Sequence, residues 1–151
     1  MKTHLSPEAV HVIPRVSCKK SVLQIMAERA ANQTDLDERE ILETLLTREK
    51  LGSTGVGRGV AIPHGKMASV DSIVMMFFKL DKPVDFDSLD DAPVDLLFLL
   101  LAPEDAGTEH LKALALVSRM MRDEDFCKKL RGSFDSDSLY ALLCPPLEQA
   151  A

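Results

Sequence analysis

The sequence contains no tryptophan, one tyrosine and three widely spaced cysteines. Few aromatic rings leave little for stacking on bases, and 24 acidic residues outnumber 18 basic ones, which gives a net charge of −6. Both features argue against a nucleic-acid partner, because such partners are held by basic side chains and aromatic rings. Cys18, Cys127 and Cys144 include no C-x-x-C pair. They are therefore expected to be reduced, mostly buried side chains and not a disulfide framework or a metal cluster.

The sequence also lacks any apolar run of the ~18 residues needed to span a bilayer. Its first residues, MKTHLSPEAV, lack the apolar stretch of a signal peptide. We therefore expect a cytoplasmic protein that is not embedded in a membrane. A composition of 46% hydrophobic and 28% charged residues excludes disordered and fibrous classes. Because no internal repeat or long linker is present, residues 1–151 are expected to form one domain around one core.

Two helices are predicted in the first third of the chain. Apolar residues between Ser21 and Ala31 fall on one broad helical face. A second helix is expected within DLDEREILETLLTREKLG, residues 35–52, where Asp37 and Glu40 resemble a capping box. Both helices precede a glycine-rich stretch.

Two short apolar runs in the middle of the chain predict buried strands. They are SIVMMFFKL, residues 72–80, and VDLLFLLLAP, residues 94–103. Further helices are expected from Thr108, between residues 123 and 132, and from a Ser136 cap to a stop at residues 145–146, which are both proline. Helices on both sides of a buried sheet predict an α/β fold of three layers.

The stretch LGSTGVGRGVAIPHGK, residues 51–66, holds five of the seven glycines. Glycine allows positive φ and a close approach of the backbone to a ligand. A surface hairpin could also need such glycines, but the embedded histidine indicates a site. GVAI is expected to be a short strand, kept extended by Pro63, whose end presents His64 before Gly65 turns the chain away.

A second histidine, His110, is expected in the first turn of the helix that follows the strand at residues 94–103. Helix N-termini at the carboxyl ends of strands are places where anions bind. His64 and His110 could therefore face one site. There the free backbone N–H groups at the helix start, with the hydroxyls of Ser53 or Thr54, could receive the oxygens of a phosphoryl group. Alternatively, His110 is a solvated surface residue.

Other sites that use these residues are disfavoured by spacing. The glycine run is no P-loop, since Lys66 is followed by methionine, and no dinucleotide fingerprint, since a helix precedes it and a strand follows. Ser53 lacks the G-x-S-x-G elbow of a hydrolase. His4 and His11 lie in a polar N-terminal segment and are given no functional role. What remains is a histidine that acts as a nucleophile toward phosphorus.

A zinc site is a further alternative that uses the same histidines. The two histidines at positions 64 and 110 could bind zinc together with Glu109 or Asp95, although no H-E-x-x-H helix is present. A metal-dependent hydrolase that uses both histidines therefore stays open as a third function.

The stretch TREKLGSTGVGRGVAIPHGK, residues 47–66, resembles the signature of enzyme IIA domains of the bacterial phosphoenolpyruvate-dependent phosphotransferase system, in the fructose, mannitol and nitrogen-regulatory class. The likeness continues through PVDFD, APVDLLFLLLAP and EHLKALALVSRMM. It implies a mixed sheet between helices, no cofactor, and a histidine-containing phosphocarrier protein as the donor. By this resemblance His64 accepts the phosphoryl group, His110 assists, and Arg48 matches the arginine of the signature. We add Thr54 as a fourth site residue because of its hydroxyl.

One departure from the family pattern is Arg58, where many members have asparagine. This arginine either screens a phosphoryl group on His64, tunes a contact with a partner, or is a solvated loop residue. No B or C component is fused within the chain, so it looks most like the nitrogen-regulatory branch, which reports phosphorylation state to regulated proteins such as sensor kinases or transporters. The alternative is a fructose-type subunit that passes phosphoryl groups to a sugar-transport IIB component.

Overall fold

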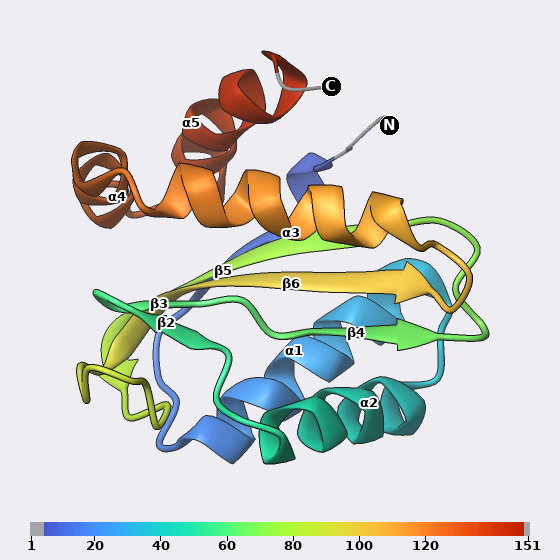
Figure 1. The fold of residues 1–151 in the computed structure, drawn as a ribbon. Coiled ribbons are helices and arrows are strands. Elements are labelled where there is room, and N and C mark those ends of the chain that lie inside the picture. Colours follow the sequence, from blue (N-terminus) through green and yellow to red (C-terminus); the bar gives the residue numbers. More distant parts are fainter. Residues whose placement is uncertain (1–4, 150–151) are drawn as a thin grey trace.

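The computed structural model describes residues 5–149, so His4 lies outside the described part of the chain. Within those residues the chain forms a short 3-10 helix, six strands and five α-helices (Figure 1). In chain order they are η1 (Pro7–Ala9), β1 (Val10–Ile13), α1 (Lys19–Thr34), α2 (Glu38–Lys50), β2 (Gly55–Gly57), β3 (Val60–Ala61), β4 (His64–Met67), β5 (Val74–Val84), β6 (Val94–Pro103), α3 (Thr108–Met121), α4 (Glu124–Arg131) and α5 (Ser136–Gln149).

The strands form one mixed sheet in the order β1-β5-β6-β3-β2, and β4 also pairs with β6. β5 and β6 are antiparallel, whereas β1 runs parallel to β5, and β3 and β4 run parallel to β6. Helices α1 and α2 cover one face of the sheet, and α3 to α5 lie on the other side (Figure 1). The predicted α/β fold of three layers with a mixed sheet is therefore confirmed.

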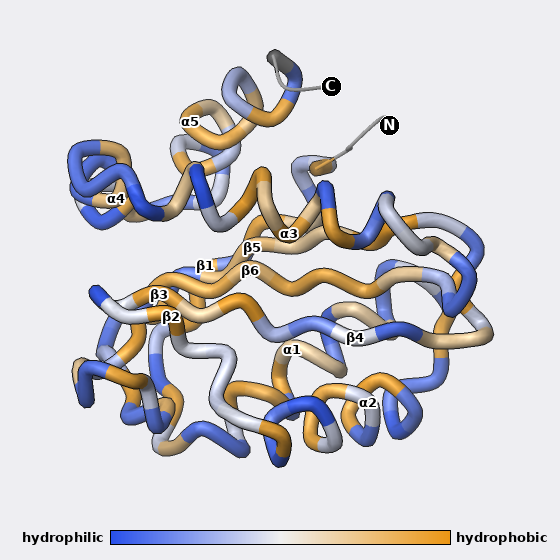
Figure 2. The backbone as a smooth tube through the Cα atoms, in the orientation of Figure 1, coloured by the Kyte–Doolittle hydropathy of each residue, from blue (hydrophilic) through white to orange (hydrophobic). Residues whose placement is uncertain are grey.

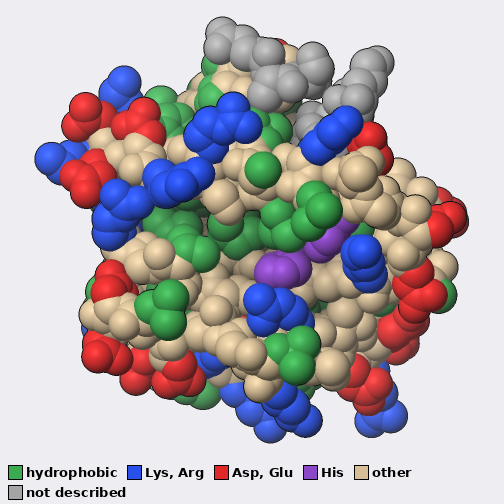
Figure 3. Space-filling model, in the orientation of Figure 1, with side chains coloured by type: hydrophobic (Ala, Val, Ile, Leu, Met, Phe, Trp, Pro, Cys, Tyr) green, Lys and Arg blue, Asp and Glu red, His purple; other side chains and the backbone are tan. Residues whose placement is uncertain are grey.

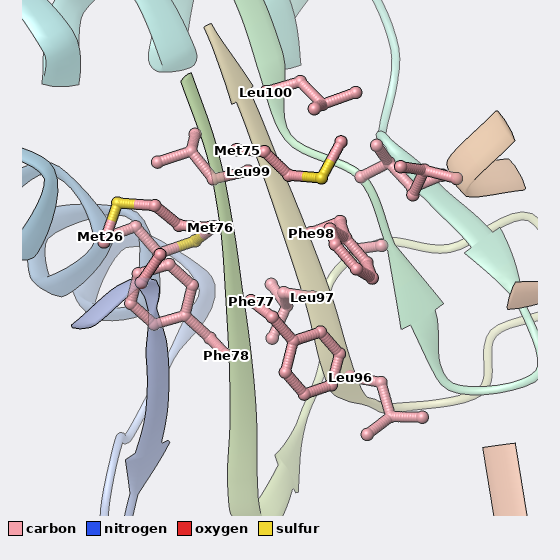
Figure 4. Close-up of a cluster of buried hydrophobic side chains, with 14 of the residues drawn as sticks. Met26, Met75, Met76, Phe77, Phe78, Leu96, Leu97, Phe98, Leu99 and Leu100 are labelled. Carbon is pink, nitrogen blue, oxygen red and sulfur yellow. The ribbon is translucent and has the colours of Figure 1, made fainter. Parts of the chain in front are cut away.

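The core lies on both faces of the central strands β5 and β6. Every residue from Leu96 to Ala102 is fully buried, which is why this stretch reads as a continuous apolar run and not as an alternating one. The rings of Phe77 and Phe98 meet edge to face, with centroids 5.1 Å apart, and Figure 4 shows them among neighbouring leucine and methionine side chains. Burial of each such side chain stabilises the fold by about 1.5–3 kcal/mol.

The helices on the surface carry the caps that their sequences predict. Asp37 accepts a hydrogen bond from the backbone N–H of Glu40 at 2.9 Å, which confirms the start of α2. Asp123 caps α4 in the same way, through the N–H of Phe126. In Figure 2 these helices alternate hydrophilic and hydrophobic residues, whereas the central strands β5 and β6 are hydrophobic over most of their length.

The N-terminal segment differs from the prediction. Residues 10–13, which the sequence places in a polar segment, form β1, which pairs in parallel with β5. His11 on this strand stacks on Phe78 with ring centroids 5.2 Å apart, and its Nδ1 lies 3.2 Å from Arg29. Four residues before a proline give too short a pattern to indicate a strand, and only pairing with β5 stabilises it.

The last helix also differs. The expected stop at Pro145 is wrong, because α5 continues through Pro145 and Pro146 to Gln149. A proline removes one helical hydrogen bond, but Leu147 beyond it is 1% exposed and packs into the core. This burial favours continuation of the helix. The expected Ser136 cap is wrong as well, since Asp135 accepts the hydrogen bond from the N–H of Ser138.

The cysteines are free, as predicted, but they are not mostly buried. Cys127 is buried, Cys144 is half-buried, and Cys18 is exposed. Cys18 stands at the surface where α1 begins, with its Sγ 3.3 Å from the hydroxyl of Ser21. In the described residues, none of the helices has both the length and the apolar character that crossing a bilayer requires.

Candidate functional site

His64 lies at the start of β4, where the chain has just passed Pro63. β3 and β4 follow one another along β6, and the register continues across the proline, with Ala61 opposite Leu97 and His64 opposite Leu100. The N–H of Leu100 donates to the carbonyl of Pro63 at 3.0 Å, which keeps the two pieces aligned. The expected turn at Gly65 is therefore wrong, because the strand runs on as far as Met67.

Gly65 has a packing role instead. A Cβ atom at this position would lie 2.4 Å from Cγ2 of Thr44, which belongs to α2. No side chain fits there, so the helix lies directly on β4. This close approach brings the last turn of α2, with Arg48, beside His64.

Two hydrogen bonds define the state of the His64 ring. Its Nδ1 lies 2.8 Å from the carbonyl oxygen of Ile62. A carbonyl only accepts, so Nδ1 carries the hydrogen and Nε2 carries the free lone pair. Nε of Arg48 donates to that Nε2 at 3.3 Å, and Nη1 of the same guanidinium donates to the carbonyl of Gly52 at 2.9 Å.

The surroundings of His64 favour its neutral form. Burial is the largest effect and lowers the pKa of His64 below its ordinary value. The hydrogen bond to Ile62 raises this pKa, the positive charge of Arg48 lowers it, and the carboxylate of Glu49 raises it. The net lowering keeps the ring neutral near pH 7, which a nucleophilic histidine requires.

His110 lies against His64. Their ring centroids are 5.6 Å apart and the planes are tilted by 45°. The His110 side chain is 6% exposed, so the alternative of a solvated surface residue is wrong. Its buried Nδ1 has no hydrogen-bond partner among the residues that the structure describes. Burial first, and then the charges of His64 and Lys66, lower the pKa of His110.

The two histidines meet at one end of a hollow beneath α3. In Figure 3 they lie side by side, and hydrophobic side chains line the hollow next to them. Three large apolar side chains, Leu51, Val56 and Leu111, are 82%, 52% and 64% exposed. A protein partner could therefore bury apolar surface while it reaches the histidines.

The hydroxyls expected to receive a phosphoryl group are already engaged. Thr54 is 4% exposed, and its Oγ1 donates to Glu49 at 2.5 Å. Ser53 donates to the carbonyl of Phe86 at 2.6 Å. A hydroxyl has one hydrogen to donate, so in this arrangement neither side chain can donate to a phosphoryl oxygen. Their bonds fix the chain between α2 and β2.

Glu49 is the site residue that sequence reasoning missed. The signal was available, because a carboxylate in the last turn of a helix opposes the helix dipole and needs another partner. Here the partners are Thr54 and Lys19, which lie in other elements.

Arg58 lies apart from the histidines. It precedes β3, where Val60 pairs with Leu96, whereas His64 pairs with Leu100. Four strand residues correspond to roughly 13 Å. The guanidinium of Arg58 is 3.4 Å from Glu124, so this geometry supports neither screening of His64 nor a purely solvated side chain.

The proposed zinc ligands do not come together. Asp95 lies at the other end of β6 and is held by Arg131, whose Nη2 is 2.8 Å from its carboxylate. Within residues 5–149, no group of three or more histidine, cysteine, aspartate or glutamate side chains is placed to hold a metal ion.

The chain is similar to known proteins over most of its length. Residues 3–144 match the family described as phosphoenolpyruvate-dependent sugar phosphotransferase system, EIIA 2. A nitrogen regulatory protein from Bradyrhizobium diazoefficiens is 52% identical over 147 residues, which cover 97% of this chain and 96% of that protein. A fructose-specific EIIA component of this system from Haloferax volcanii is 33% identical over 86% of this chain and 85% of its own length. The crystal structure of nitrogen regulatory protein IIA-Ntr from Neisseria meningitidis has a TM-score of 0.86 at 33% identity, covering 91% of this chain and 94% of that one.

Proposed function

This chain belongs to the EIIA 2 family of the phosphoenolpyruvate-dependent sugar phosphotransferase system, and we propose that it accepts a phosphoryl group on Nε2 of His64 from a histidine-containing phosphocarrier protein. The observation that carries this proposal is the hydrogen bond from Nδ1 to the Ile62 carbonyl, which leaves Nε2 with its lone pair. The lowered pKa of His64 keeps that lone pair free of a proton.

The transfer needs no cofactor and no proton movement. The lone pair of Nε2 forms a bond to phosphorus, while the phosphorus–nitrogen bond of the donor breaks and its electron pair returns to the donor imidazole. The hydrogen on Nδ1 stays in its bond to the carbonyl of Ile62, which stabilises the positive charge that develops on the ring. Such a transfer depends on positioning and on stabilisation of charge.

Two neighbours are suited to bind the phosphoryl oxygens. When Nε2 forms its bond to phosphorus, the N–H of Arg48 loses its acceptor and becomes free to bond an oxygen of the new group. The His110 ring lies against the same ring, and its buried Nδ1 has no hydrogen-bond partner among the described residues. We infer that a ring N–H of His110 donates a hydrogen bond to the phosphoryl group. Thr54 acts indirectly, by holding the loop after α2.

In the cell, we propose that this protein is cytoplasmic, works as a single EIIA-type domain over residues 1–151, and reports its phosphorylation state to regulated proteins such as sensor kinases or transporters. Support comes from the 52% identical relative, which is a nitrogen regulatory protein. The second candidate is a subunit that passes phosphoryl groups to a sugar-transport IIB component, and it is supported by similarity to a fructose-specific EIIA component.

The test is reconstitution with phosphoenolpyruvate, the first enzyme of the system and a histidine-containing phosphocarrier. We expect one acid-labile phosphoryl group per chain, assigned to Nε2 of His64 by phosphorus–nitrogen NMR, and no labelling of His64→Ala. Labelling of His64→Ala at the wild-type rate would overturn the assignment. Rapid transfer of the phosphoryl group from His64 to a purified fructose IIB component would support the second candidate. Absence of this transfer would support the first.

A further inference from the structure

Glu49 occupies a position that is unfavourable for a carboxylate. It lies in the last turn of α2, where the helix dipole is negative, and its side chain is 6% exposed. A buried charge is retained only when partners compensate for the loss of water. The partners of Glu49 therefore indicate the role of its carboxylate.

Three bonds from two other segments converge on this carboxylate. Oε1 accepts the backbone N–H of Thr54 at 3.1 Å and lies 3.0 Å from Nζ of Lys19. Oε2 accepts the hydroxyl of Thr54 at 2.5 Å. Lys19, the first residue of α1, is itself held over the ring of Phe86 and lies 3.8 Å from Asp87. The carboxylate thus joins the end of α2 to α1 and to the loop before β2.

We propose that Glu49, held by Lys19, is a positioning residue for phosphoryl transfer, because it fixes the last turn of α2 and Thr54 so that Arg48 keeps its guanidinium against Nε2 of His64. This inference rests on the proposed function of His64.

The geometry explains why Arg48 needs such support. The arginine side chain is long and has several rotatable bonds, so its guanidinium stays in place only where the segments it contacts are fixed. Arg48 donates to Gly52, and Glu49 accepts from Thr54, so the loop between α2 and β2 is bound at two adjacent points. Loss of the Glu49 carboxylate frees the loop at Thr54. The carbonyl of Gly52, which accepts the second hydrogen bond of Arg48, then moves.

Glu49 also acts on His64 through its charge. The charged and titratable groups around this ring are Arg48 and Glu49 from α2, His110 from α3, and Lys66 from β4 beside His110. Among these four groups, Glu49 carries the negative charge. Its charge opposes that of Arg48 and favours the positive charge that the ring gains during transfer.

The experiment compares Glu49→Gln with Glu43→Gln, a matched change at an exposed position of the same helix. We expect Glu49→Gln to slow transfer from the phosphocarrier at least about tenfold, with an unchanged circular dichroism spectrum, and Glu43→Gln to match wild type. The second measurement is the NMR signal of the Arg48 Nε–H in the unphosphorylated protein. In wild type this signal should be sharp and should lie away from the position of solvent-exposed arginines. In Glu49→Gln it should move to that position.

Lys19 supplies a second arm in case Glu49→Gln does not fold. Lys19→Met should reproduce the slower transfer and the altered Arg48 signal, and Lys19→Arg should restore both. A wild-type rate and an unchanged Arg48 signal in a folded Glu49→Gln variant, or in Lys19→Met if the first does not fold, would overturn the inference. The Arg48 NMR signal is measured without a phosphoryl donor, so it reports the position of the guanidinium whether or not His64 is the acceptor. Labelling of His64→Ala would refute the proposed acceptor but would leave this NMR result interpretable.

Discussion

Nε of Arg48 donates a hydrogen bond to Nε2 of His64 at 3.3 Å, although sixteen positions separate the two residues. The bond marks Nε2 as the atom with the free lone pair and places a positive charge beside it, where we propose that the phosphoryl group binds. The same guanidinium also donates to Gly52. A planar group with several fixed donors can make both contacts at once.

The planar guanidinium leads to the first prediction. Arg48→Lys keeps the charge but loses the two-directional geometry, so transfer to His64 should slow by about 10²-fold, as for loss of one preorganised donor. Rapid-quench kinetics with phosphorylated phosphocarrier measure the rate. Arg39→Lys, at an exposed position on the same helix, is the matched control and should match wild type. Equal rates for the two variants would mean that charge alone matters at position 48.

His110 is predicted to assist without being the attachment point. His110→Ala should accept one phosphoryl group per chain, at a rate lower by about 10- to 10²-fold, because a donor to the phosphoryl oxygens is lost. The final stoichiometry from mass spectrometry and the rate from rapid quench separate the two effects. A wild-type rate in this variant would remove His110 from the mechanism.

Transfer should depend on pH with a definite sign. The pKa of His64 is lowered, chiefly by burial, so the ring stays neutral through pH 7 and protonates only below the usual histidine range of about 6.5. The rate should therefore be flat above that value and fall as the pH drops through the lowered pKa. NMR titration of the His64 ring checks the value. A midpoint above about 6.5 would contradict the burial argument.

The same lowering predicts acid sensitivity of the fold. His11, His64 and His110 all have pKa values lowered first by burial. A group whose folded pKa is depressed stabilises the protein above its unfolded pKa, and this contribution is lost as the pH falls through the folded value. The free energy of unfolding by urea should therefore decrease below about pH 6.5. It should decrease less steeply in His110→Gln, and an equal slope would show that His110 does not contribute.

Gly65 should be intolerant of a side chain. Gly65→Ala would place its Cβ 2.4 Å from Cγ2 of Thr44, so the Thr44 side chain or α2 must shift, at a cost of about 1–3 kcal/mol in the free energy of unfolding. Adding Thr44→Ser removes the clashing methyl group and should recover part of the loss. Gly132→Ala is the control, because its nearest neighbours would be at an ordinary 3.5 Å. Urea unfolding of the four proteins measures these differences, and equal stability of Gly65→Ala and wild type would refute the packing role.

Several features of this protein follow from the sequence alone, because their causes are local. The unbroken apolar run of residues 94–103 identified β6 as a strand buried on both faces, and Asp37 identified the start of α2. The motif around Pro63 and His64 led directly to the family. Each of these signals lies within a few residues of the feature that it predicts.

Other features were decided only by tertiary structure, because their causes join residues far apart in the chain. β1 forms because β5 pairs with it, and α5 passes two prolines because Leu147 is buried. The geometry of the candidate site belongs to this class as well. His110 is buried only because α3 packs over β6 and against His64, and Glu49 is held only because α1 brings Lys19 to the end of α2. Burial and ion pairing are properties of the packed layers, so a pattern within one segment predicts the side chain but not the neighbour that it meets.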